Sequence, residues 1–553
     1  MSSLVTRVSP VIDGAPELIG DGVSRVRAIR IDSGYTPPLY LRADSSVRGV
    51  YRIDALPFEL VLPIGRAELL SGDPSAVPSG NNYFVSDAGS SSNSGTIASP
   101  WSLTYAFAGA GGVIAPGDTI WIRGGTYVGT FSVTCNDGVA GNRIVFRQYG
   151  GDAPLGERVR IDGEIQVKRE YIDVRGLEVF QTDPNATLIS GIILGSDTTS
   201  TKGSRVINCI VHDCGEQGCT GWLNARGSMY YGVISYNNGT HHNKDHGFYN
   251  HDQEKVFEQC ISFNNLARGF QSYDSVRDQK HITFRQLIAF GNGSISTIVN
   301  ADCNFNLKVL APRMADDIQM DTCVGYHAAA IGKSRQLRLG TDGNIAPPGW
   351  LQGQVTTAIR NCYFWRARHT VEVAQWQQLV FEDNTIISTS DTSDIVNFIA
   401  SGSIWTSWER NVWYMDPALL KWTYKFRRDF ANWQSAIGVG ATDTASAATP
   451  PTRYWIWANQ FEPGRGHLAI CNHDLLDEVP VSLDGVVTIG DAYEIRNVQD
   501  LWGAAVVSGV YDGSPINVPM AGIAAPVPGG ASRVFATPPV TGPEFNAFVV
   551  LTV

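Results

Sequence analysis

The sequence predicts an all-β protein whose central part is a parallel β-solenoid, and two observations support this class. The 553-residue chain contains 57 Gly, 14 Trp, 20 Tyr and 22 Phe but only 17% charged residues, a composition typical of β-structure with many turns. A short strand pattern also recurs through the middle of the chain at intervals of 23–39 residues. Repeats of this length without helical periodicity indicate coils that bury their hydrophobic faces by stacking.

Composition divides the chain into five parts. Residues 1–70 contain short strands between turns, which predict a small N-terminal β-domain, and residues 71–82 form a Gly/Pro/Ser-rich linker. The repeats occupy residues 83–437, where a helix over "SPWSLTYAF", with Ser99 as its N-cap, could cap the first coil. A second linker covers 438–452, and the short strands of 453–553 predict a C-terminal β-sandwich.

One row of the repeat passes through nine hydrophobic, Cys or Thr positions, and in eight of them the preceding residue is Asn, Gly or Gln. The row comprises Leu177, Cys209, Val233, Cys260, Leu287, Cys323, Cys362, Thr385 and Val412. Its four cysteines should therefore stack as small buried residues. The nine cysteines of the chain follow no disulfide framework, so we expect all of them to be free thiols.

A second row lies 12–18 residues before the first and begins with a Gly, Asn or Thr followed by a hydrophobic residue. The row comprises Gly191-Ile192, Gly221-Trp222, Gly247-Phe248, Gly269-Phe270, Asn306-Leu307 and Thr370-Val371. If these hydrophobic residues point inward, the alternation of a β-strand sends the next residues outward on one shared face.

The stretch "THHNKDHGFYNHDQ" (residues 240–253) holds four of the ten histidines and falls on this second row. A predicted stripe of outward residues, long enough for several sugar rings, contains Tyr249, His251, Gln271, Tyr273, Lys308 and Glu372, with His246, Arg268 and Asp274 at the strand edges. The alternative is a solvated corner without function, which applies above all to the loop insertion at 240–244.

Several segments resemble the right-handed parallel β-helix proteins of the pectate-lyase-like superfamily. They are "NYFVSDAGSSSNSGTIASPWSL" with "PGDTIWIRGGTY", the "HGFY" step, the "N-x-I-x-F" coils, and "ANQFEPGRGHLAICNHD" in the C-terminal part. The resemblance covers residues 82–553 and implies a right-handed helix that acts on a polysaccharide. It does not fix the chemistry, because this superfamily includes lyases, hydrolases, epimerases, tailspikes and proteins without activity.

Two reactions fit the residues of the stripe. For β-elimination on a uronic-acid polymer, the candidate catalytic residues are His246, Tyr249, His251, Lys308 and Arg268, and the candidate substrate-binding residues are Gln271, Tyr273, Glu372 and Asp274. The sequence establishes no cofactor, and the candidate is Ca²⁺ bound by Asp245 and Asp252, with Asp274 as a further oxygen ligand. A glycoside hydrolase would instead use a pair of carboxyls from Asp245, Asp252, Asp274 and Glu372. A tailspike or adhesin that binds carbohydrate without catalysis is the third alternative.

Charge and hydropathy restrict the classes of binding partner that the sequence allows. The net charge is −11 with no basic block, which argues against nucleic acid, and no apolar run approaches the ~20 residues that span a bilayer. The start, "MSSLVTRVSPVIDG", has no signal-peptide pattern. We therefore expect a polysaccharide partner, a monomer or a homotrimer, and action outside the cell or on a virion.

Overall fold

The computed structural model describes residues 80–240, 244–251, 253–275, 277–296, 303–309, 313, 315–328, 334–340, 356–374, 376–389, 392–398, 405–529 and 536–553, and the backbone of six strands before residue 71. The chain divides into two compact units, of which the first comprises residues 1–78, 140–142 and 460–463. That unit contains two three-stranded sheets, formed by β1 (Thr6–Arg7), β2 (Ala28–Ile31) and β5 (Phe58–Val61), and by β4 (Gly49–Ile53), β3 (Leu39–Ser45) and β6 (Gly65–Leu70).

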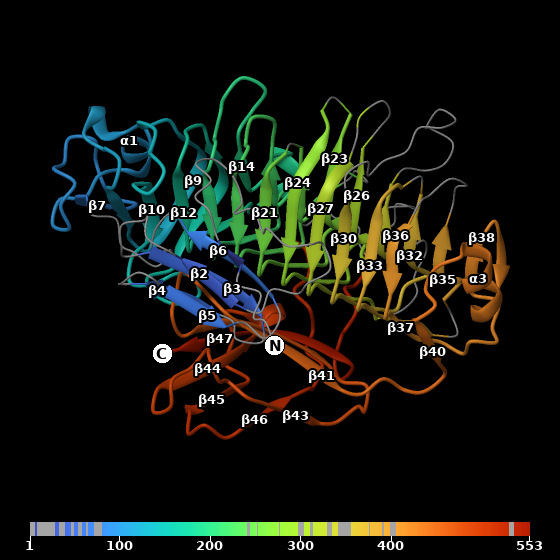
Figure 1. Ribbon diagram of the computed structural model, residues 1–553. Helices are drawn as coiled ribbons and strands as arrows, with labels where there is room; N and C mark the ends of the chain where they lie inside the picture. The colour runs from blue at the N-terminus through green and yellow to red at the C-terminus, as the bar shows by residue number, and fades with distance from the viewer. Residues whose placement is uncertain are drawn as a thin grey trace. The chain divides into compact units, whose positions relative to one another are not determined.

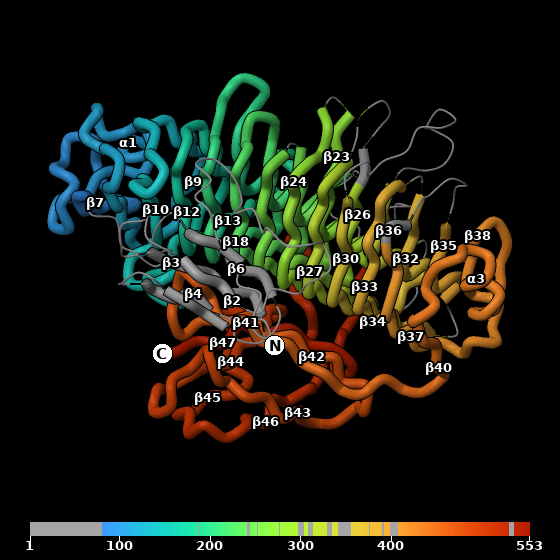
Figure 2. Tube along the Cα trace, in the orientation of Figure 1, coloured from blue at the N-terminus to red at the C-terminus, as the bar shows by residue number. Residues whose placement is uncertain are grey.

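The second unit contains a β-helix whose coils follow one another in sequence order (Figures 1 and 2). Each complete coil contributes one strand to each of three parallel sheets. The first, the twelve-stranded sheet, contains β7 (Asn82–Val85), β8 (Thr119–Ile122), β10 (Ile144–Gln148), β12 (Ile172–Arg175), β15 (Arg205–Ile207), β18 (Met229–Tyr231), β21 (Lys255–Glu258), β24 (Gln279–Arg285), β27 (Ala315–Asp321), β30 (Thr357–Arg360), β33 (Leu379–Glu382) and β36 (Trp405–Glu409).

The other two sheets are named here for their outer surfaces. The polar sheet contains β14 (Ile192–Leu194), β17 (Cys219–Gly221), β20 (Phe248–Asn250), β23 (Arg268–Asp274), β26 (Cys303–Val309), β29 (Arg335–Leu339), β32 (His369–Val373), β35 (Asp394–Phe398) and β38 (Trp422–Tyr424). The covered sheet contains β13 (Glu178–Phe180), β16 (Ile210–His212), β19 (Ile234–Tyr236), β22 (Ile261–Phe263), β25 (Ile288–Phe290), β28 (Val324–Tyr326), β31 (Tyr363–Trp365), β34 (Thr385–Ile387), β37 (Val412–Tyr414) and β40 (Thr444–Ser446).

A few elements complete the β-helix. The long strands β9 (Gly125–Val133) and β11 (Val159–Val167) pair with each other, and β11 also pairs with both β13 and β14. Strand β39 (Phe426–Arg428) runs antiparallel to β38. The helical elements are α1 (Leu103–Phe107), η1 (Ala110–Gly112), α2 (Pro184–Thr187) and α3 (Phe430–Ile437). The N-cap of α1 is Ser102, so the prediction that Ser99 begins this helix was wrong by three residues.

The turn from the twelve-stranded sheet to the covered sheet explains the Asn, Gly or Gln that precedes most of the repeat positions. Thr385 and Val412 were assigned one residue too late, because Thr385 pairs with Tyr363 and Val412 pairs with Thr385, which aligns Asn384 and Asn411 with Cys362. Asn208, Gln259 and Asn361 have φ of 52°, 51° and 54°, and Gly232 has 64°. This left-handed conformation is accessible to glycine without strain and is enriched in asparagine among the other residues. The residue that follows each turn is buried, and there Cys209, Cys260, Cys323 and Cys362 occupy equivalent positions.

Within this row only Cys323 and Cys362 lie on adjacent coils, because Val233 and Leu287 come between the others. All nine cysteines fall in described parts of the chain, and all are buried free thiols. Next to the polar sheet, the interior contains a second ladder of stacked rings. Phe248 and Phe270 lie 4.7 Å apart between ring centroids, and Phe270 and Phe305 lie 5.4 Å apart. The all-β parallel helix predicted from the repeats is therefore confirmed.

Two assignments in the second predicted row need correction. Phe248 pairs with Cys219 of β17, so Cys219 is the inward residue of this coil and the assignment of Trp222 was wrong by three residues. Trp222 instead follows β17 and is half-buried. Phe270 pairs with Phe305 rather than Leu307, a shift of two residues that leaves both side chains inside. Coils of unequal length caused both errors, since a local sequence pattern does not reveal where an extra residue enters a turn.

The C-terminal part forms two small antiparallel sheets. Five strands pair in the order β41 (Arg453–Ala458), β42 (Arg465–Cys471), β47 (Phe545–Thr552), β44 (Ala492–Asn497) and β45 (Val507–Val510), with η2 (Val498–Asp500) after β44. Strands β43 (Glu478–Val481) and β46 (Ile516–Pro519) form the second sheet. Leu468 and Phe548 of the first sheet and Val481 and Val518 of the second share one buried cluster. The domain limits 1–70, 71–82, 83–437, 438–452 and 453–553 stay predictions.

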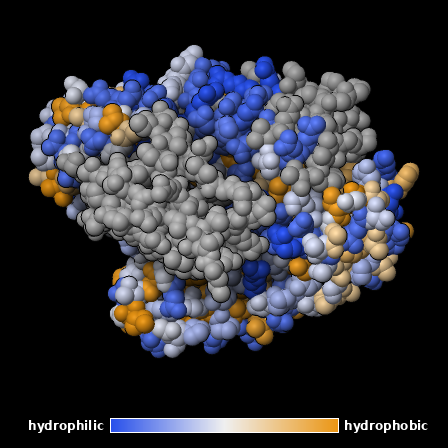
Figure 3. Space-filling model, in the orientation of Figure 1, coloured by the Kyte–Doolittle hydropathy of each residue, from blue (hydrophilic) through white to orange (hydrophobic). Residues whose placement is uncertain are grey.

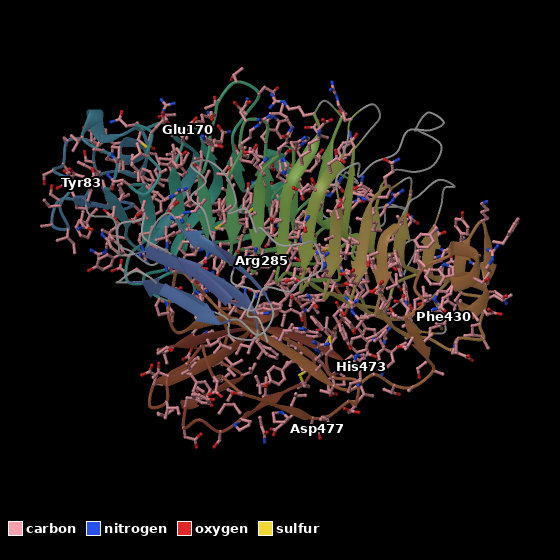
Figure 4. All side chains as sticks on the ribbon, viewed as in Figure 1. Tyr83, Glu170, Arg285, Phe430, His473 and Asp477 are labelled. Atoms are coloured by element: carbon pink, nitrogen blue, oxygen red, sulfur yellow. The ribbon has the colours of Figure 1, made fainter. Side chains whose placement is uncertain are left out.

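The opposite face of the five-stranded sheet packs on the covered sheet. Phe545 stacks on Tyr326 at 4.7 Å, and the neighbouring Glu544 accepts hydrogen bonds from the Arg366 guanidinium and the Tyr326 hydroxyl. His473, labelled in Figure 4, lies with Nε2 2.7 Å from the Tyr363 hydroxyl. The outer surface of the covered sheet is thus occupied by the protein itself.

Candidate functional site

The outer surface of the polar sheet carries the residues singled out in the sequence. Parallel register aligns one outward row across successive strands, because equivalent positions alternate in the same phase. This row comprises Thr220, Tyr249, Gln271, Asn306, Arg338, Glu372 and Asn397. A second pairing aligns Tyr273 with Lys308. The predicted stripe therefore exists as a geometric arrangement, and its role stays a prediction. In Figure 3, hydrophilic residues gather along the upper edge of the molecule in that view.

Two arginines pair with one carboxylate in this stripe, and a third lies near them. The Nε atoms of Arg335 and Arg338 each lie 2.9 Å from Oε1 of Glu372. Arg268 is close enough to both for their charges to act on it, and burial together with repulsion from Arg338 and Arg335 lowers the pKa of its guanidinium to about 10. The cluster, defined as Arg268, Arg335, Arg338 and Glu372, thus carries more positive than negative charge.

Tyr249 lies at the edge of this cluster. Burial raises the pKa of its phenol well above the ordinary value, and the nearby Tyr273 and Asp274 act in the same direction, while Arg268 opposes them. The phenol therefore stays protonated throughout the neutral range and can donate a hydrogen bond or a proton. Cys303, aligned with Arg268, has a thiol pKa raised by burial to about 11, so it stays a thiol.

His251 is packed between two aromatic rings. Its ring centroid lies 4.1 Å from that of Trp222 and 4.0 Å from that of Tyr249. Burial, with a smaller effect from Lys255, lowers its pKa to about 3, and Nε2 has no hydrogen-bond partner among the described residues. The imidazole is therefore neutral near pH 7, and its low basicity makes it a weak general base.

The remaining candidates are less accessible or fall outside the described residues. His246 is buried, with Nδ1 3.4 Å from the backbone nitrogen of Arg268 and its ring edge against Tyr249. Gln271, Asp274 and Glu372 are buried too, and Tyr273 is half-buried. Gln271 accepts a hydrogen bond of 2.6 Å from Asn306. The backbone of Lys308 lies on β26, but its side chain and all of Asp252 lie outside the described residues.

Of the two main predicted Ca²⁺ ligands, Asp245 and Asp252, only Asp245 is described. Its carboxylate is buried and accepts a hydrogen bond of 3.0 Å from the Thr240 backbone nitrogen. In the parts of the chain that the structure describes, no three His, Cys, Asp or Glu side chains gather as a metal site. Because Asp252 lies outside the described residues, the Ca²⁺ site stays a prediction.

Arg335 and Arg338 were missed in the sequence. They stand in "SRQLRLG", where Leu337 is the inward residue aligned with Phe305 and Val371. A signal was present in the sequence: a Leu flanked by arginines lies between the steps Asn306-Leu307 and Thr370-Val371. It was overlooked because this coil lacks the step of a glycine followed by a hydrophobic residue that marks other coils.

Within the described residues, no helix is long and apolar enough to span a lipid bilayer.

Comparison with known proteins agrees with the fold. Residues 83–332 match the family model described as Pel9A-like, right handed beta helix region. Similar solved structures include pectate lyase Pel9A, with 16% identity, 68% of this chain and 80% of that chain covered, and a TM-score of 0.39. An alginate lyase from Paenibacillus sp. str. FPU-7 is 15% identical, with 60% and 97% covered and a TM-score of 0.38.

The Dettilon tailspike protein is 9% identical, with 79% of this chain and 88% of that chain covered and a TM-score of 0.38. No curated protein matches the chain. The coil register and the matching family model agree: residues 83–332 of this chain form parallel β-helix coils and are similar to the Pel9A-like right-handed β-helix region.

Proposed function

We propose that this protein cleaves a uronic-acid-containing polysaccharide by β-elimination on the outer surface of the polar sheet. The observation that carries the proposal is the arginine cluster, in which Arg335 and Arg338 pair with the carboxylate of Glu372 and Arg268 lies near enough to both for their charges to act on it. Partly desolvated guanidinium groups form strong bidentate contacts with carboxylates, and a uronic acid supplies one carboxylate per sugar.

The reaction needs three functions at one sugar unit. A cation must stabilise the uronate carboxylate as charge develops, a base must remove the proton on the carbon next to it, and the glycosidic oxygen must leave. The C–H electrons form the new C=C bond as the C–O bond breaks, and the leaving oxygen receives a proton. The arginine cluster suits the first function, and Tyr249, which stays protonated, suits proton donation to the leaving oxygen.

For the base, chemistry favours Lys308 over His251. The imidazole, whose pKa burial lowers to about 3, accepts a proton poorly near neutral pH. Lys308 lies on β26, one strand from Arg268 and one strand from Arg335, aligned with Tyr273. Its position in the register supports this role.

Hydrolysis is supported less well, because it needs two carboxyls that face each other across a sugar. The neighbours of Glu372 in its row are Arg338 and Asn397, and its Oε1 is engaged by two guanidiniums. In this stretch of the stripe, Glu372 therefore lacks a facing carboxyl that could act with it as an acid–base pair.

A polysaccharide panel tests the proposal. Polygalacturonate, alginate and rhamnogalacturonan should give an absorbance at 235 nm for at least one polymer, whereas reducing ends without this absorbance would mean hydrolysis. Binding without any cleavage would instead indicate a carbohydrate-binding protein. On a polymer that is cleaved, we expect Arg268→Gln, Lys308→Ala and Tyr249→Phe each to lower kcat/KM by roughly 10²-fold or more.

The matched control is Arg360→Gln. Arg360 also pairs with a glutamate, at 3.1 Å to Glu382, but on the twelve-stranded sheet. This variant should keep full activity. Melting temperatures close to that of the parent protein would show that the losses come from the reaction and not from unfolding. Full activity of all three polar-sheet variants would contradict the proposed site.

A further inference from the structure

The aromatic residues at the end of β17 and β20 are not explained by the elimination reaction. Trp222 follows β17, and His251 follows β20, where its backbone nitrogen donates to the Gly221 carbonyl at 2.8 Å. This hydrogen bond continues the parallel register beyond both strands, so Trp222, His251 and Tyr273 belong to one outward row. Trp222 and Tyr273 are both half-buried, which leaves part of each ring at the surface.

The indole of Trp222 is held in a fixed orientation. Its Nε1 donates to Oδ1 of Asp197 at 2.7 Å, and one edge packs against the His251 ring at a centroid distance of 4.1 Å. The Asn224 side chain donates to the backbone carbonyls of Ser196 and Asp197, both at 3.0 Å, which ties the loop after β17 to the loop that carries Asp197. A preorganised ring loses little conformational entropy when a ligand binds.

The support beneath these rings is a buried polar network. Asn250 and Ser272 both donate to Oε1 of Gln279, at 2.9 and 2.7 Å, and Lys255 donates to the Gly221 carbonyl at 3.3 Å. Buried hydrogen bonds of this kind help to fix backbone positions. The strands that present Trp222, Tyr249 and His251 are therefore held from inside as well as by their own ladder.

We infer that Trp222, supported by His251 and Tyr249, forms a stacking subsite for a sugar ring of the polymer, separate from the arginine cluster. Sugar rings present apolar C–H faces while their hydroxyls point to the side, and a flat aromatic ring with a fixed polar edge complements that face. This inference extends the proposed function and rests on it for the position of cleavage, since elimination would occur at the cluster and not at Trp222.

The spacing of the coils predicts a dependence on chain length. Trp222 follows β17, whereas Arg268 lies on β23 and Arg338 on β29, two and four strands further. At ~4.8 Å per strand these separations are roughly 10 and 19 Å along the sheet. A trisaccharide held by Arg335 and Arg338, four strands from β17, is too short to reach the indole, whereas a hexasaccharide held there does reach it.

Two properties distinguish the stacking subsite from the arginine cluster. Burial lowers the His251 pKa to about 3, so the rings stay uncharged from pH 5 upward and their contribution should not depend on salt. Binding by the exposed parts of the arginines should weaken as salt screens their charge.

The inference is tested by calorimetric titration of the protein with tri- and hexasaccharides prepared from polygalacturonate, alginate and neutral xylan. Trp222→Ala should weaken hexasaccharide binding about 3- to 10-fold for the polymer whose fragments bind best, equally at low and high salt, and leave trisaccharide binding unchanged. Trp222→Phe should recover part of this loss. Trp121→Ala is the matched control, because Trp121 is also half-buried with Nε1 2.8 Å from a side-chain oxygen, that of Asn82, but lies on the twelve-stranded sheet.

The outcomes separate the two proposals. Unchanged hexasaccharide affinity in Trp222→Ala, or a parent protein that binds no hexasaccharide, would overturn the subsite. A Trp222-dependent affinity without any absorbance at 235 nm would keep the subsite and refute the lyase. An equal loss in Trp121→Ala would show that the effect is not specific to this surface, and would also overturn the inference.

Discussion

Replacing Glu372 with Gln tests the character of the arginine cluster without knowledge of the substrate. The side chain of Glu372 is 2% exposed, and those of Arg335 and Arg338 are 11% and 6% exposed. Glu372→Gln keeps the shape and one carbonyl acceptor but removes the carboxylate that pairs with both guanidiniums. Three positive charges then remain close together in a region that water reaches poorly.

The expected loss of stability follows from this burial. Removing one partner of a buried ion pair costs about 3–5 kcal/mol, and the neutral hydrogen bonds that Gln retains are about half as strong as charge-assisted ones. We therefore expect about 2–4 kcal/mol. The unfolding entropy is about 2 cal/mol/K per residue, so a cooperative unit of ~500 residues would lose roughly 2–4 °C in melting temperature.

Thermal unfolding with and without sulfate or galacturonate is the assay. An anion that takes the place of the missing carboxylate should restore most of the lost stability of Glu372→Gln, because a ligand that binds only the folded state stabilises it. Glu382→Gln is the control, since Glu382 also faces two arginines, Arg360 at 3.1 Å and Arg410 at 3.7 Å, but all three side chains are only half-buried. A loss in Glu372→Gln that neither anion reverses would refute the anion site.

Three further predictions concern stability and thiol state. Phe248→Ala should cost about 3–5 kcal/mol in urea unfolding, because this 1%-exposed ring stacks on Phe270, and a loss below ~1 kcal/mol would contradict the inward ladder. Burial alone would lower the pKa of His212, but its contacts with Asp213 and Glu178 raise it to about 9, above the ~6.5 of an unfolded histidine. Its stabilising effect is therefore full below about pH 6.5 and lost as the pH rises towards 9, and His212→Gln should flatten this part of the stability profile; an unchanged profile would refute the pairing. After denaturation without reductant, all nine cysteines should react with a thiol reagent, and recovery of seven or fewer would show a disulfide.

The sequence by itself determined the parallel coils and much of their register. Each turn into the covered sheet needs a left-handed residue followed by a buried one, so Asn208 and Cys209 leave a local signature that returns once per coil. The steps at Gly247-Phe248 and Gly269-Phe270 similarly aligned Tyr249 with Gln271 on one outward face. Both signals are local in sequence, because a stacked coil imposes the same steric demand at every repeat.

Only the tertiary structure decided which surface is available and which charges meet there. Phe545 packs on Tyr326 across more than two hundred residues of sequence, and a single contact of this kind has no period to detect. Arg268 and Arg338 belong to strands separated by one other, β26, so their proximity depends on the length of every turn between them. The position of Trp222 was predicted wrongly for the same reason. The alternation of a β-strand tells which face a side chain occupies only when the register of the strand is known. Because the turns vary in length, this register is set by the packing of the coils and not by the local sequence.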